Sequence, residues 1–523
     1  MMRRMRLHHA ALAVLSAGLV GVWFGHGADA ATTCEDLSAV KLPNTTITLA
    51  RTVAAGAFTP PPARGGAPGG GRGPQFNDLP AFCRVQATLT PSSDSDIRME
   101  LWLPASGWNQ KLRGTGNGGL GGGAGVNANA LAAGLRLGYA TAGNNTGHEG
   151  DSSYALDHPE KIKDFGYRSA HEMTVASKAI VKAFYAMPVK ASVMAEGGGG
   201  TIAALSAAQR FPDDYDAIAV TGMSSYLTRH TFAQMWVWMA THKDEASFIP
   251  PAKYAVLHQA ALDACDALDG LKDGIVGAVE RCMFDPGVTQ CKGADGADCL
   301  TSPQVEAARK IYAGPRNPRT GDEIYSPLYP GSELGWGQLA GGDQPLGIPV
   351  EFFKYYVFRD PAWDYRKRPI NFDGDVELSN RPEIQPVNAV DPDLTRFFAR
   401  GGKLLLVDGW ADTAVPPKVA INYHNAVVKK VGAARVRSSM RFFMVPGMGH
   451  GPGTTGPHNF TFDALSLIEQ WRETGKAPEQ LIVAHYKDGQ DVGKRIVCQY
   501  PQVATYKGSG NTEDPASFAC SPR

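Results

Sequence analysis

The chain has 523 residues, with 51 basic and 51 acidic side chains and a formal net charge of zero. This balance provides no basic surface for nucleic acid or an anionic membrane, so we expect neither as a partner. The length exceeds what one hydrophobic core normally serves, which predicts a main domain with a large insertion or a second domain.

The first 30 residues have the pattern of a secretory signal peptide. Arg3, Arg4 and Arg6 precede an apolar stretch at 10–24, and small residues at 28–30 offer a cleavage site. A membrane anchor is the alternative, but the apolar stretch is shorter than the roughly 20 residues that cross a bilayer. We therefore expect a secreted or periplasmic protein that is not held in a membrane.

All eight cysteines lie after this segment. In an oxidising compartment an even number of cysteines predicts disulfide bonds. Zinc binding is the alternative, but no two cysteines are spaced as C-x-x-C and no histidine lies beside them. The predicted disulfide cysteines are Cys34, Cys83, Cys265, Cys282, Cys291, Cys299, Cys498 and Cys520.

Strands and helices alternate through the first half of the exported chain. Strand, tight turn, helix and strand in succession are typical of a parallel α/β sheet. The expected elements are a strand with one buried face at 97–103, an amphipathic helix at 170–185, a strand at 191–195, a glycine turn at 197–200, an alanine-rich helix to Arg210 and a strand at 215–220.

The pattern changes between residues 224 and 400, where cysteines, aromatics and prolines cluster with little alternation. Alternation resumes with strands at 403–408 and 441–445, with a helix between them and another at 462–474. A sheet interrupted by a long lid and then completed is the simplest interpretation. The predicted divisions are a signal peptide at 1–30, an α/β domain at 31–223, a lid at 224–400 and the rest of the α/β domain at 401–523.

Two loops follow late strands, where an open α/β sheet binds its ligand. The first ends in Asp412 and the second in His450. An acid followed by a histidine matches the chain order of α/β-hydrolases, in which the carboxylate orients the imidazole and the imidazole moves a proton. The alternative is a helix-capping aspartate and a histidine in a glycine turn. We favour catalysis because the two loops support each other.

Short motifs recur along almost the whole exported chain. They are CEDL at 34–37, LPNTTI at 42–47, FCRV at 82–85, GWN at 107–109, GNGG at 116–119, AQRFP at 208–212, GWAD at 409–412, PGMGH at 446–450, GKAP at 475–478 and YPQV at 500–503. Together they resemble the tannase and feruloyl esterase family, which also includes mono(2-hydroxyethyl) terephthalate hydrolase. The resemblance implies an α/β-hydrolase fold with a large inserted lid, and a small aromatic or phenolic ester as substrate.

The resemblance also implies a structural calcium site in the lid, in the motif CDALDGLKDGI at 265–275. Calcium prefers six or more oxygen ligands. Here they would be the carboxylates of Asp266, Asp269 and Asp273 and the carbonyls of Leu271 and Ile275. An acidic, solvated turn is the alternative. The cation would fix an irregular lid that has little core of its own.

The chain departs from the family at the turn between strand and helix that carries the nucleophile, here called the elbow. The family has Gly-Cys-Ser-x-Gly-Gly there, and its elbow cysteine bonds to a second cysteine after the histidine. Counting back from the motif at 208–212 gives EGGGGT at 196–201, with Gly198 at the serine position. Gly197 and Gly451 occupy the two cysteine positions, so the loss is coordinated.

Glycine has no side chain that attacks a carbonyl, so an acyl-enzyme at residue 198 is chemically impossible. We expect general-base chemistry by His450 held by Asp412. Backbone amides at the elbow, at Gly198 and Gly199, and in the loop with Gly118 and Gly119 would form an oxyanion hole. Attack by water fits this arrangement, and so does removal of a substrate proton.

Other side chains remain candidates at the elbow. Glu196 could act as nucleophile or base, because burial would raise the pKa of its carboxyl. Thr201, Ser224 and Ser225 could approach from neighbouring turns. Each of these residues is equally typical of a helix cap or loop.

The hypothesis we favour is an exported esterase-like enzyme that acts on an aromatic or phenolic ester. A lyase or isomerase with His450 as general base is the second hypothesis. A catalytically silent binding protein is the third, and retention of both His450 and Asp412 argues against it.

Overall fold

The computed structural model describes residues 32–60, 76–117, 120, 125–453 and 458–522. The predicted signal peptide lies outside these residues. Within them, no helix has the length and apolar character needed to cross a membrane.

A nine-stranded sheet forms the centre of the molecule, in the order β1-β2-β3-β5-β4-β6-β7-β8-β9. The first three pairings, from β1 to β5, are antiparallel, and those from β5 to β9 are parallel. This is the mostly parallel sheet expected of an α/β-hydrolase. The strands are β1 (Thr45–Val53), β2 (Phe82–Leu89), β3 (Ile97–Pro104), β4 (Lys111–Thr115), β5 (Ala140–Asn144), β6 (Ala191–Gly197), β7 (Ala217–Thr221), β8 (Lys403–Gly409) and β9 (Met440–Val445).

Helices cover both faces of the parallel half, as the alternating sequence pattern predicts. On one face, Leu405 and Val407 of β8 pack with Trp471 of α14. On the other face, Leu404 and Leu406 pack with α4 and α12. The covering helices are α1 (Ala128–Arg136), α3 (Ser169–Tyr185), α4 (Gly200–Arg210), α12 (Lys418–Val431), α13 (Ala433–Ser439) and α14 (Ala464–Thr474), while α2 (Pro159–Lys163) lies in the segment between β5 and α3.

The prediction of one buried face for the strand at 97–103 is wrong. In β3 only Arg98 is exposed, and the other residues of the strand are buried. The strand lies between β2 and β5, so both of its faces are covered. Met99 and Leu101 pack on α3, and Trp102 packs on the opposite face with Phe82.

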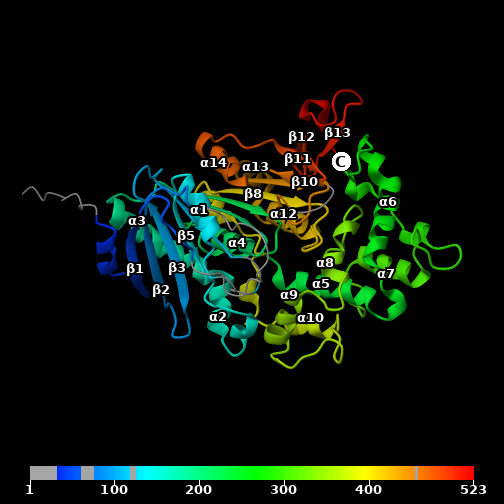
Figure 1. The fold of residues 1–523 in the computed structure, drawn as a ribbon, viewed down its shortest axis with the longest axis horizontal. Coiled ribbons are helices and arrows are strands. Elements are labelled where there is room, and N and C mark those ends of the chain that lie inside the picture. The colour runs from blue at the N-terminus through cyan, green and yellow to red at the C-terminus, as the bar shows by residue number, and fades with distance from the viewer. Residues whose placement is uncertain (1–31, 61–75, 118–119, 121–124, 454–457, 523) are drawn as a thin grey trace, which may run out of the picture.

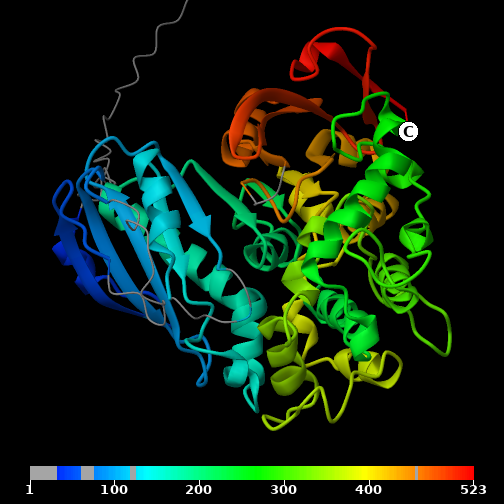
Figure 2. The same ribbon diagram turned by 45° about the vertical axis from the view of Figure 1, so that its right-hand side comes forward.

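The segment between β7 and β8 is helical and lies opposite the antiparallel edge of the sheet (Figures 1 and 2). The expectation that this lid has little core of its own is wrong. A cluster of buried side chains that includes Leu257, Val305 and Trp336 belongs to the lid alone. The lid helices are α5 (Leu227–Thr241), α6 (Tyr254–Cys265), α7 (Ser302–Ala313), α8 (Gly337–Ala340), α9 (Gly347–Glu351), α10 (Gly374–Ser379) and α11 (Thr395–Ala399).

Two small sheets follow the central one and were not predicted. The first joins β10 (His458–Thr461), β11 (Gln480–Lys487) and β12 (Gln490–Cys498), and the second joins β13 (Val503–Tyr506) and β14 (Phe518–Ser521). Buried residues of β11, such as Leu481 and Val483, share a core with β8, β9 and α14. The C-terminal chain therefore packs against the central sheet.

The predicted disulfides are confirmed. The four bonds are Cys34–Cys83, Cys265–Cys282, Cys291–Cys299 and Cys498–Cys520. Disulfides persist in oxidising compartments, so these bonds indicate a location outside the cytoplasm.

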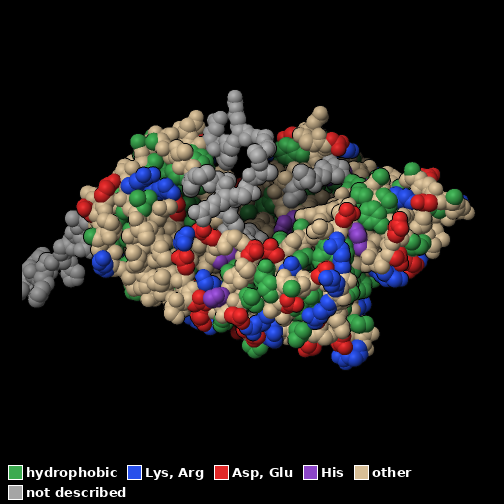
Figure 3. Space-filling view, turned by 60° about the horizontal axis from the view of Figure 1, so that its bottom comes forward, with side chains coloured by type: hydrophobic (Ala, Val, Ile, Leu, Met, Phe, Trp, Pro, Cys, Tyr) green, Lys and Arg blue, Asp and Glu red, His purple; other side chains and the backbone are tan. Residues whose placement is uncertain are grey.

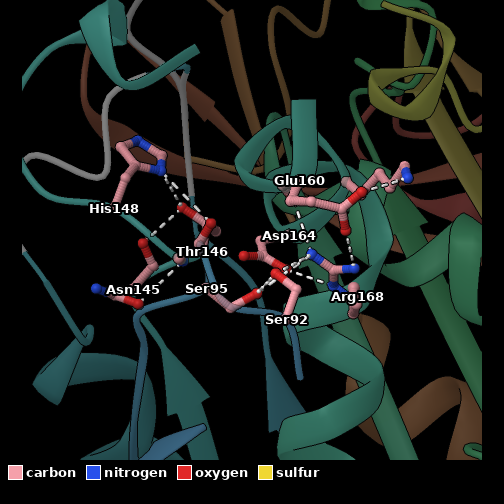
Figure 4. A network of polar contacts seen from close by, with 10 residues as sticks. Ser92, Ser95, Asn145, Thr146, His148, Glu160, Asp164 and Arg168 are labelled. Carbon is pink, nitrogen blue, oxygen red and sulfur yellow. Dashed lines mark hydrogen bonds and ion pairs between the residues drawn. The ribbon is translucent and has the colours of Figure 1, made fainter. Parts of the chain in front are cut away.

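A polar network fixes the segment between β5 and α3 (Figure 4). Arg168 donates hydrogen bonds to Asp164 at 2.5 Å and to Glu160 at 2.6 Å. In the same segment, the His148 ring contacts the carbonyl oxygen of Leu120 at 3.1 Å. These contacts hold the chain that follows β5 against its neighbours.

Candidate active site

Asp412 and His450 lie in the loops after β8 and β9, and the fold brings their side chains together. His450 Nδ1 lies 2.7 Å from Asp412 Oδ2. The Asp412 side chain is fully buried, and its other oxygen accepts the N–H of Val415 at 2.9 Å. A carboxylate held in this way fixes both the orientation and the tautomer of the imidazole.

The charge environment of His450 favours its protonated form. Burial opposes protonation, but the charges of Asp412 and Asp408 and the hydrogen bond to Asp412 outweigh it and raise the pKa of His450 to about 8. The imidazole is therefore a stronger base than a free histidine.

Asp408, near the end of β8, is a site residue that the sequence analysis missed. Its side chain is fully buried, and it accepts the N–H groups of Gly409 at 2.9 Å and Met223 at 3.3 Å. Burial and the nearby charge of Asp412 raise the pKa of Asp408 to about 8. An aspartate directly after an apolar run of strand residues was the signal that could have revealed it.

The elbow between β6 and α4 faces the imidazole. Gly198 has a φ of +53°, and a Cβ atom placed on it would lie 3.0 Å from His450 Nε2. Gly222, after β7, has a φ of +58°, and its Cβ would lie 3.2 Å from Nδ1. The ring therefore lies against two glycines, and residue 198 points at the nitrogen that does not contact Asp412.

Gly197 and Gly451, at the two expected cysteine positions, both lie next to Thr221 Oγ1. A Cβ on Gly197 would lie 3.0 Å from Thr221 Oγ1, and a Cβ on Gly451 would lie 3.9 Å from the same oxygen. The Thr221 hydroxyl therefore fills the space between residues 197 and 451.

Glu196 lies on the other side of the elbow, between the ends of β4 and α4. Its Oε2 would lie 3.2 Å from a Cβ on Gly116 and 2.5 Å from one on Gly200. Burial raises the pKa of Glu196 to about 7, against the opposing effects of a hydrogen bond from the Gly116 backbone and the charge of Arg113. In the described chain no hydrogen bond joins this carboxylate to His450.

Thr201 and Ser225 form hydrogen bonds with their hydroxyl groups that hold the elbow in place. Thr201 Oγ1 donates to the carbonyl of Gly198 at 2.6 Å, and it accepts the backbone N–H of Ser224 at 3.0 Å. Ser225 Oγ donates to the same threonine oxygen at 3.1 Å. The Ser224 hydroxyl donates instead to the carbonyl of Gly222 at 3.5 Å. Gly199 lies at the N-terminus of α4, whereas Gly118 and Gly119 lie outside the described residues.

The predicted calcium loop is compact and closed by the Cys265–Cys282 disulfide. Burial and the mutual repulsion of the carboxylates raise the pKa of Asp269 to about 6. Asp266 accepts the backbone N–H groups of Asp273 at 3.2 Å and Gly274 at 3.0 Å. These buried oxygens suit a hard cation.

Two observations show that the carboxylates of the loop do not form a complete cage for a cation. Asp273 forms an ion pair with Arg495 at 2.8 Å. Among the described residues, the one group of three or more His, Cys, Asp or Glu ligand atoms within 4.8 Å of one another is Cys291, Asp295 and Cys299. The cysteines of that group are bonded to each other, so it is no thiolate metal site.

A cavity of about 690 Å³ opens beside His450, between the lid and the loops after β8 and β9. Figure 3 shows a hollow on one face of the molecule with a histidine side chain in it. Besides His450, two further histidines line the cavity, His258 from α6 and His458 from β10. Sequence analysis missed both, because nothing local distinguishes them from surface histidines.

The lid also brings two polar side chains close to His450 and Asp412. His230 of α5 is 4% exposed, and its ring makes no hydrogen bond within the described chain. Burial and the charge of His450 lower the pKa of His230 to about 3, so it remains neutral. The hydroxyl of Tyr325 is likewise buried without a partner in the described chain.

Comparisons with known proteins show the family of the chain. A family model described as "Tannase and feruloyl esterase" matches residues 83–521. The chain is 37% identical to an uncharacterized esterase of Xanthomonas campestris pv. campestris, over 95% of this chain and 92% of the relative. It is 30% identical to a probable feruloyl esterase B of Aspergillus clavatus, over 92% of this chain and 94% of the relative.

Solved structures show the same fold. The crystal structure of feruloyl esterase B from Aspergillus oryzae matches with a TM-score of 0.84 and 26% identity, covering 93% of this chain and 99% of that one. Tannin acyl hydrolase from Aspergillus niger shares the fold with a TM-score of 0.76 and 18% identity, over 94% of this chain and 95% of that one. The fold is that of an α/β-hydrolase, and the chain belongs to the tannase and feruloyl esterase family of carboxylic ester hydrolases.

Proposed function

We propose that this protein is an exported hydrolase of aromatic or phenolic esters that uses the His450–Asp412 dyad and forms no covalent intermediate at residue 198. The observation that carries the proposal is the distance of 3.0 Å between His450 Nε2 and a Cβ placed on Gly198. Nε2 faces the position that a nucleophile would occupy. The substrate class comes from the family, which acts on phenolic esters such as ferulate and tannin esters.

In this mechanism water is the nucleophile. The water oxygen attacks the ester carbonyl while His450 Nε2 takes one of its protons, and Asp412 stabilises the imidazolium that forms. When the tetrahedral intermediate collapses, the imidazolium gives that proton to the leaving oxygen. The products are the carboxylic acid and the alcohol or phenol, and the imidazole is neutral again.

The start of α4 supplies the electrostatic part of the mechanism. Backbone N–H groups at a helix N-terminus carry a positive partial charge, and Gly199 and Gly200 lie at that end of α4. Glycines let an oxyanion approach these amides closely.

We also propose that calcium binds the loop at 265–275 as a structural cation. Asp266 and Asp269 would hold it with their carboxylates, and Leu271 and Ile275 with their carbonyls. Asp273 would contribute in spite of its ion pair with Arg495. A bound cation would neutralise carboxylates that now repel one another.

The test is turnover of a chromogenic phenolic ester, such as 4-nitrophenyl ferulate, by the purified protein. We expect hydrolysis by the wild type and a loss of about 10²- to 10⁴-fold in kcat for His450→Ala, the range for removal of a general base. His158→Ala is a matched control, because His158 is also paired with an aspartate, Asp94, at 2.9 Å.

Hydrolysis that survives in His450→Ala would contradict the assigned base. Tight binding of the ester without release of the phenol would instead support a lyase, an isomerase or a silent binder. Unchanged kinetics in His158→Ala are needed before a loss in His450→Ala counts as specific.

A further inference from the structure

We propose that His258 and His458 form a subsite that binds hydroxyl groups of the ligand, in the cavity that His450 also lines. Both side chains are fixed by hydrogen bonds that leave one ring nitrogen as an acceptor. The inference rests on the proposed function only in taking this cavity as the substrate pocket.

A chain of hydrogen bonds sets the tautomer of His458. His485 Nδ1 lies 2.8 Å from Glu513 Oε2, and His458 Nδ1 lies 2.9 Å from His485 Nε2. An ionised carboxylate only accepts, so His485 Nδ1 carries a proton, and in the neutral ring its Nε2 is an acceptor. His458 Nδ1 must then be the donor, which leaves the lone pair on His458 Nε2 free.

The surroundings hold this chain rigidly. His485 is 1% exposed, and its ring stacks on Phe460 with their centroids 4.8 Å apart. Arg495 forms an ion pair with Glu513 at 2.7 Å, which keeps that carboxylate ionised. Neither imidazole can turn without breaking these contacts.

The free nitrogen of His458 faces the cavity wall. A Cβ placed on Gly274 would lie 3.1 Å from His458 Nε2, and both residues line the cavity. Because Gly274 has no side chain, the acceptor stays uncovered. The glycine also has a φ of +87°, which few other residues adopt.

His258 repeats this arrangement from the lid. Its Nδ1 lies 2.8 Å from Glu333 Oε2, and the Glu333 side chain is fully buried. The other oxygen of Glu333 accepts Tyr312 Oη at 2.7 Å and the N–H of Gly331 at 2.8 Å. The carboxylate thus makes His258 Nδ1 the donor, and in the neutral ring Nε2 is the second free acceptor.

Two neutral acceptors recognise hydrogen-bond donors, and hydroxyl groups are the uncharged donors that an ester ligand carries. A phenolic ring with several hydroxyls and a sugar share this chemistry. Metal binding is the other use of paired histidines backed by carboxylates. In the described chain, neither histidine belongs to a group of three His, Cys, Asp or Glu ligand atoms within 4.8 Å of one another.

The experiment compares binding of three uncleaved probes by calorimetry: 3,4,5-trihydroxybenzamide, benzamide and methyl glucoside. The variants are His258→Asn and His458→Asn. The amide of asparagine can replace Nδ1 as donor but does not reach the place of Nε2. His171→Asn is the control, because His171 also pairs with a carboxylate, Asp214 at 2.8 Å, but does not line the cavity. Equal thermal midpoints show that the variants fold.

We expect the trihydroxy probe to bind more tightly than benzamide. Each asparagine variant should lower the affinity for the trihydroxy probe by about three- to tenfold, which corresponds to the loss of one hydrogen bond. Benzamide binding and the His171→Asn control should not change. If the glucoside alone shows this loss, the hydroxyls are those of a carbohydrate.

Equal affinities in wild type and both variants for every probe would overturn the subsite. The assay needs no turnover, so it is independent of the outcome for ester hydrolysis. A protein that binds the trihydroxy probe through these histidines but hydrolyses nothing would keep the subsite and refute the proposed reaction.

Discussion

At residue 198 the difference between a serine hydrolase and the mechanism proposed above is one side chain. The backbone around Gly198 keeps the left-handed conformation of an elbow, with a φ of +53°, and the imidazole faces it. The proposed base and its acid are in contact, while residue 198 has no hydroxyl that they could activate. The geometry therefore predicts that a serine introduced there meets a working base.

We expect Gly198→Ser to react with a fluorophosphonate probe that labels activated serines, because Ser Oγ would lie beside His450 Nε2. The wild type should not be labelled at this residue. Intact-mass measurement followed by peptide mapping gives the readout. The double variant with His450→Ala is the control and should lose the label, whereas labelling of wild type at any side chain of the elbow contradicts the mechanism.

The pH dependence of hydrolysis should follow His450. Its pKa is raised to about 8, and only the neutral imidazole is a base, so kcat/KM should rise with pH through an inflection near 8. The charged or titratable groups around the ring are Asp412 and Asp408 on the β8 side and His230 on α5.

Asp412→Asn removes the nearest negative charge, so the inflection should move to lower pH while the plateau rate falls. Rate profiles of wild type and variant between pH 5 and pH 10 measure the shift. An inflection that stays in place would mean that another group controls the rate.

At the scale of single elements, the sequence predicted most where local patterns are strong. The helix at 170–185 and the strands at 191–195, 403–408 and 441–445 were all found, because apolar periodicity and flanking glycines mark them. Asp412 and His450 were found because each follows such a strand. Their contact was expected from the order of acid and histidine along the chains of α/β-hydrolases.

Other elements depend on contacts that local patterns do not encode. β3 contains the exposed Arg98 but is otherwise buried. Its second face is covered by residues that are distant in sequence, which no local pattern reveals. His258 and His458 belong to α6 and β10, which meet only in the folded molecule. Asp408 was overlooked because it continues a strand instead of standing in a motif.

The antiparallel pair β2 and β3 contains a buried ion pair. Arg84 Nε lies 2.5 Å from Glu100 Oε1, and both side chains are 9% exposed. Glu100 also accepts Trp102 Nε1 at 2.6 Å. Glu100→Ala would leave the arginine buried without its partner.

We expect Glu100→Ala to lower the free energy of unfolding by about 3–5 kcal/mol, as for other broken buried pairs. Urea denaturation followed by fluorescence measures it. Asp96→Ala is the control, because Asp96 pairs with Arg98 at the exposed start of the same strand, and its loss should cost about 1 kcal/mol or less. If both variants lowered the free energy of unfolding equally, the burial of the Arg84–Glu100 pair would not be the cause of the loss.

Across the whole molecule, lid and sheet form one packed body. The largest buried cluster joins Ile218 and Leu406 of the sheet to Phe352 and Trp363 of the lid. The proposed calcium loop lies where the lid approaches the C-terminal chain, since Asp273 pairs with Arg495 of β12. A cation there would stabilise both parts together.

We therefore expect calcium to raise the thermal midpoint of the purified protein and EGTA to lower it. The Asp269→Asn variant should lose most of this response, because it removes a negative ligand. Differential scanning calorimetry with and without 1 mM calcium measures the shift. A wild-type midpoint that does not respond to calcium would contradict the proposed site.

The most direct test of the central claim is the mass of the enzyme during turnover. Wild-type protein is mixed with a phenolic ester, quenched in acid within milliseconds to seconds, and measured intact. We predict hydrolysis with only the unmodified mass at every time, and its loss in His450→Ala. An added acyl mass that forms and decays at the rate of turnover would contradict attack by water.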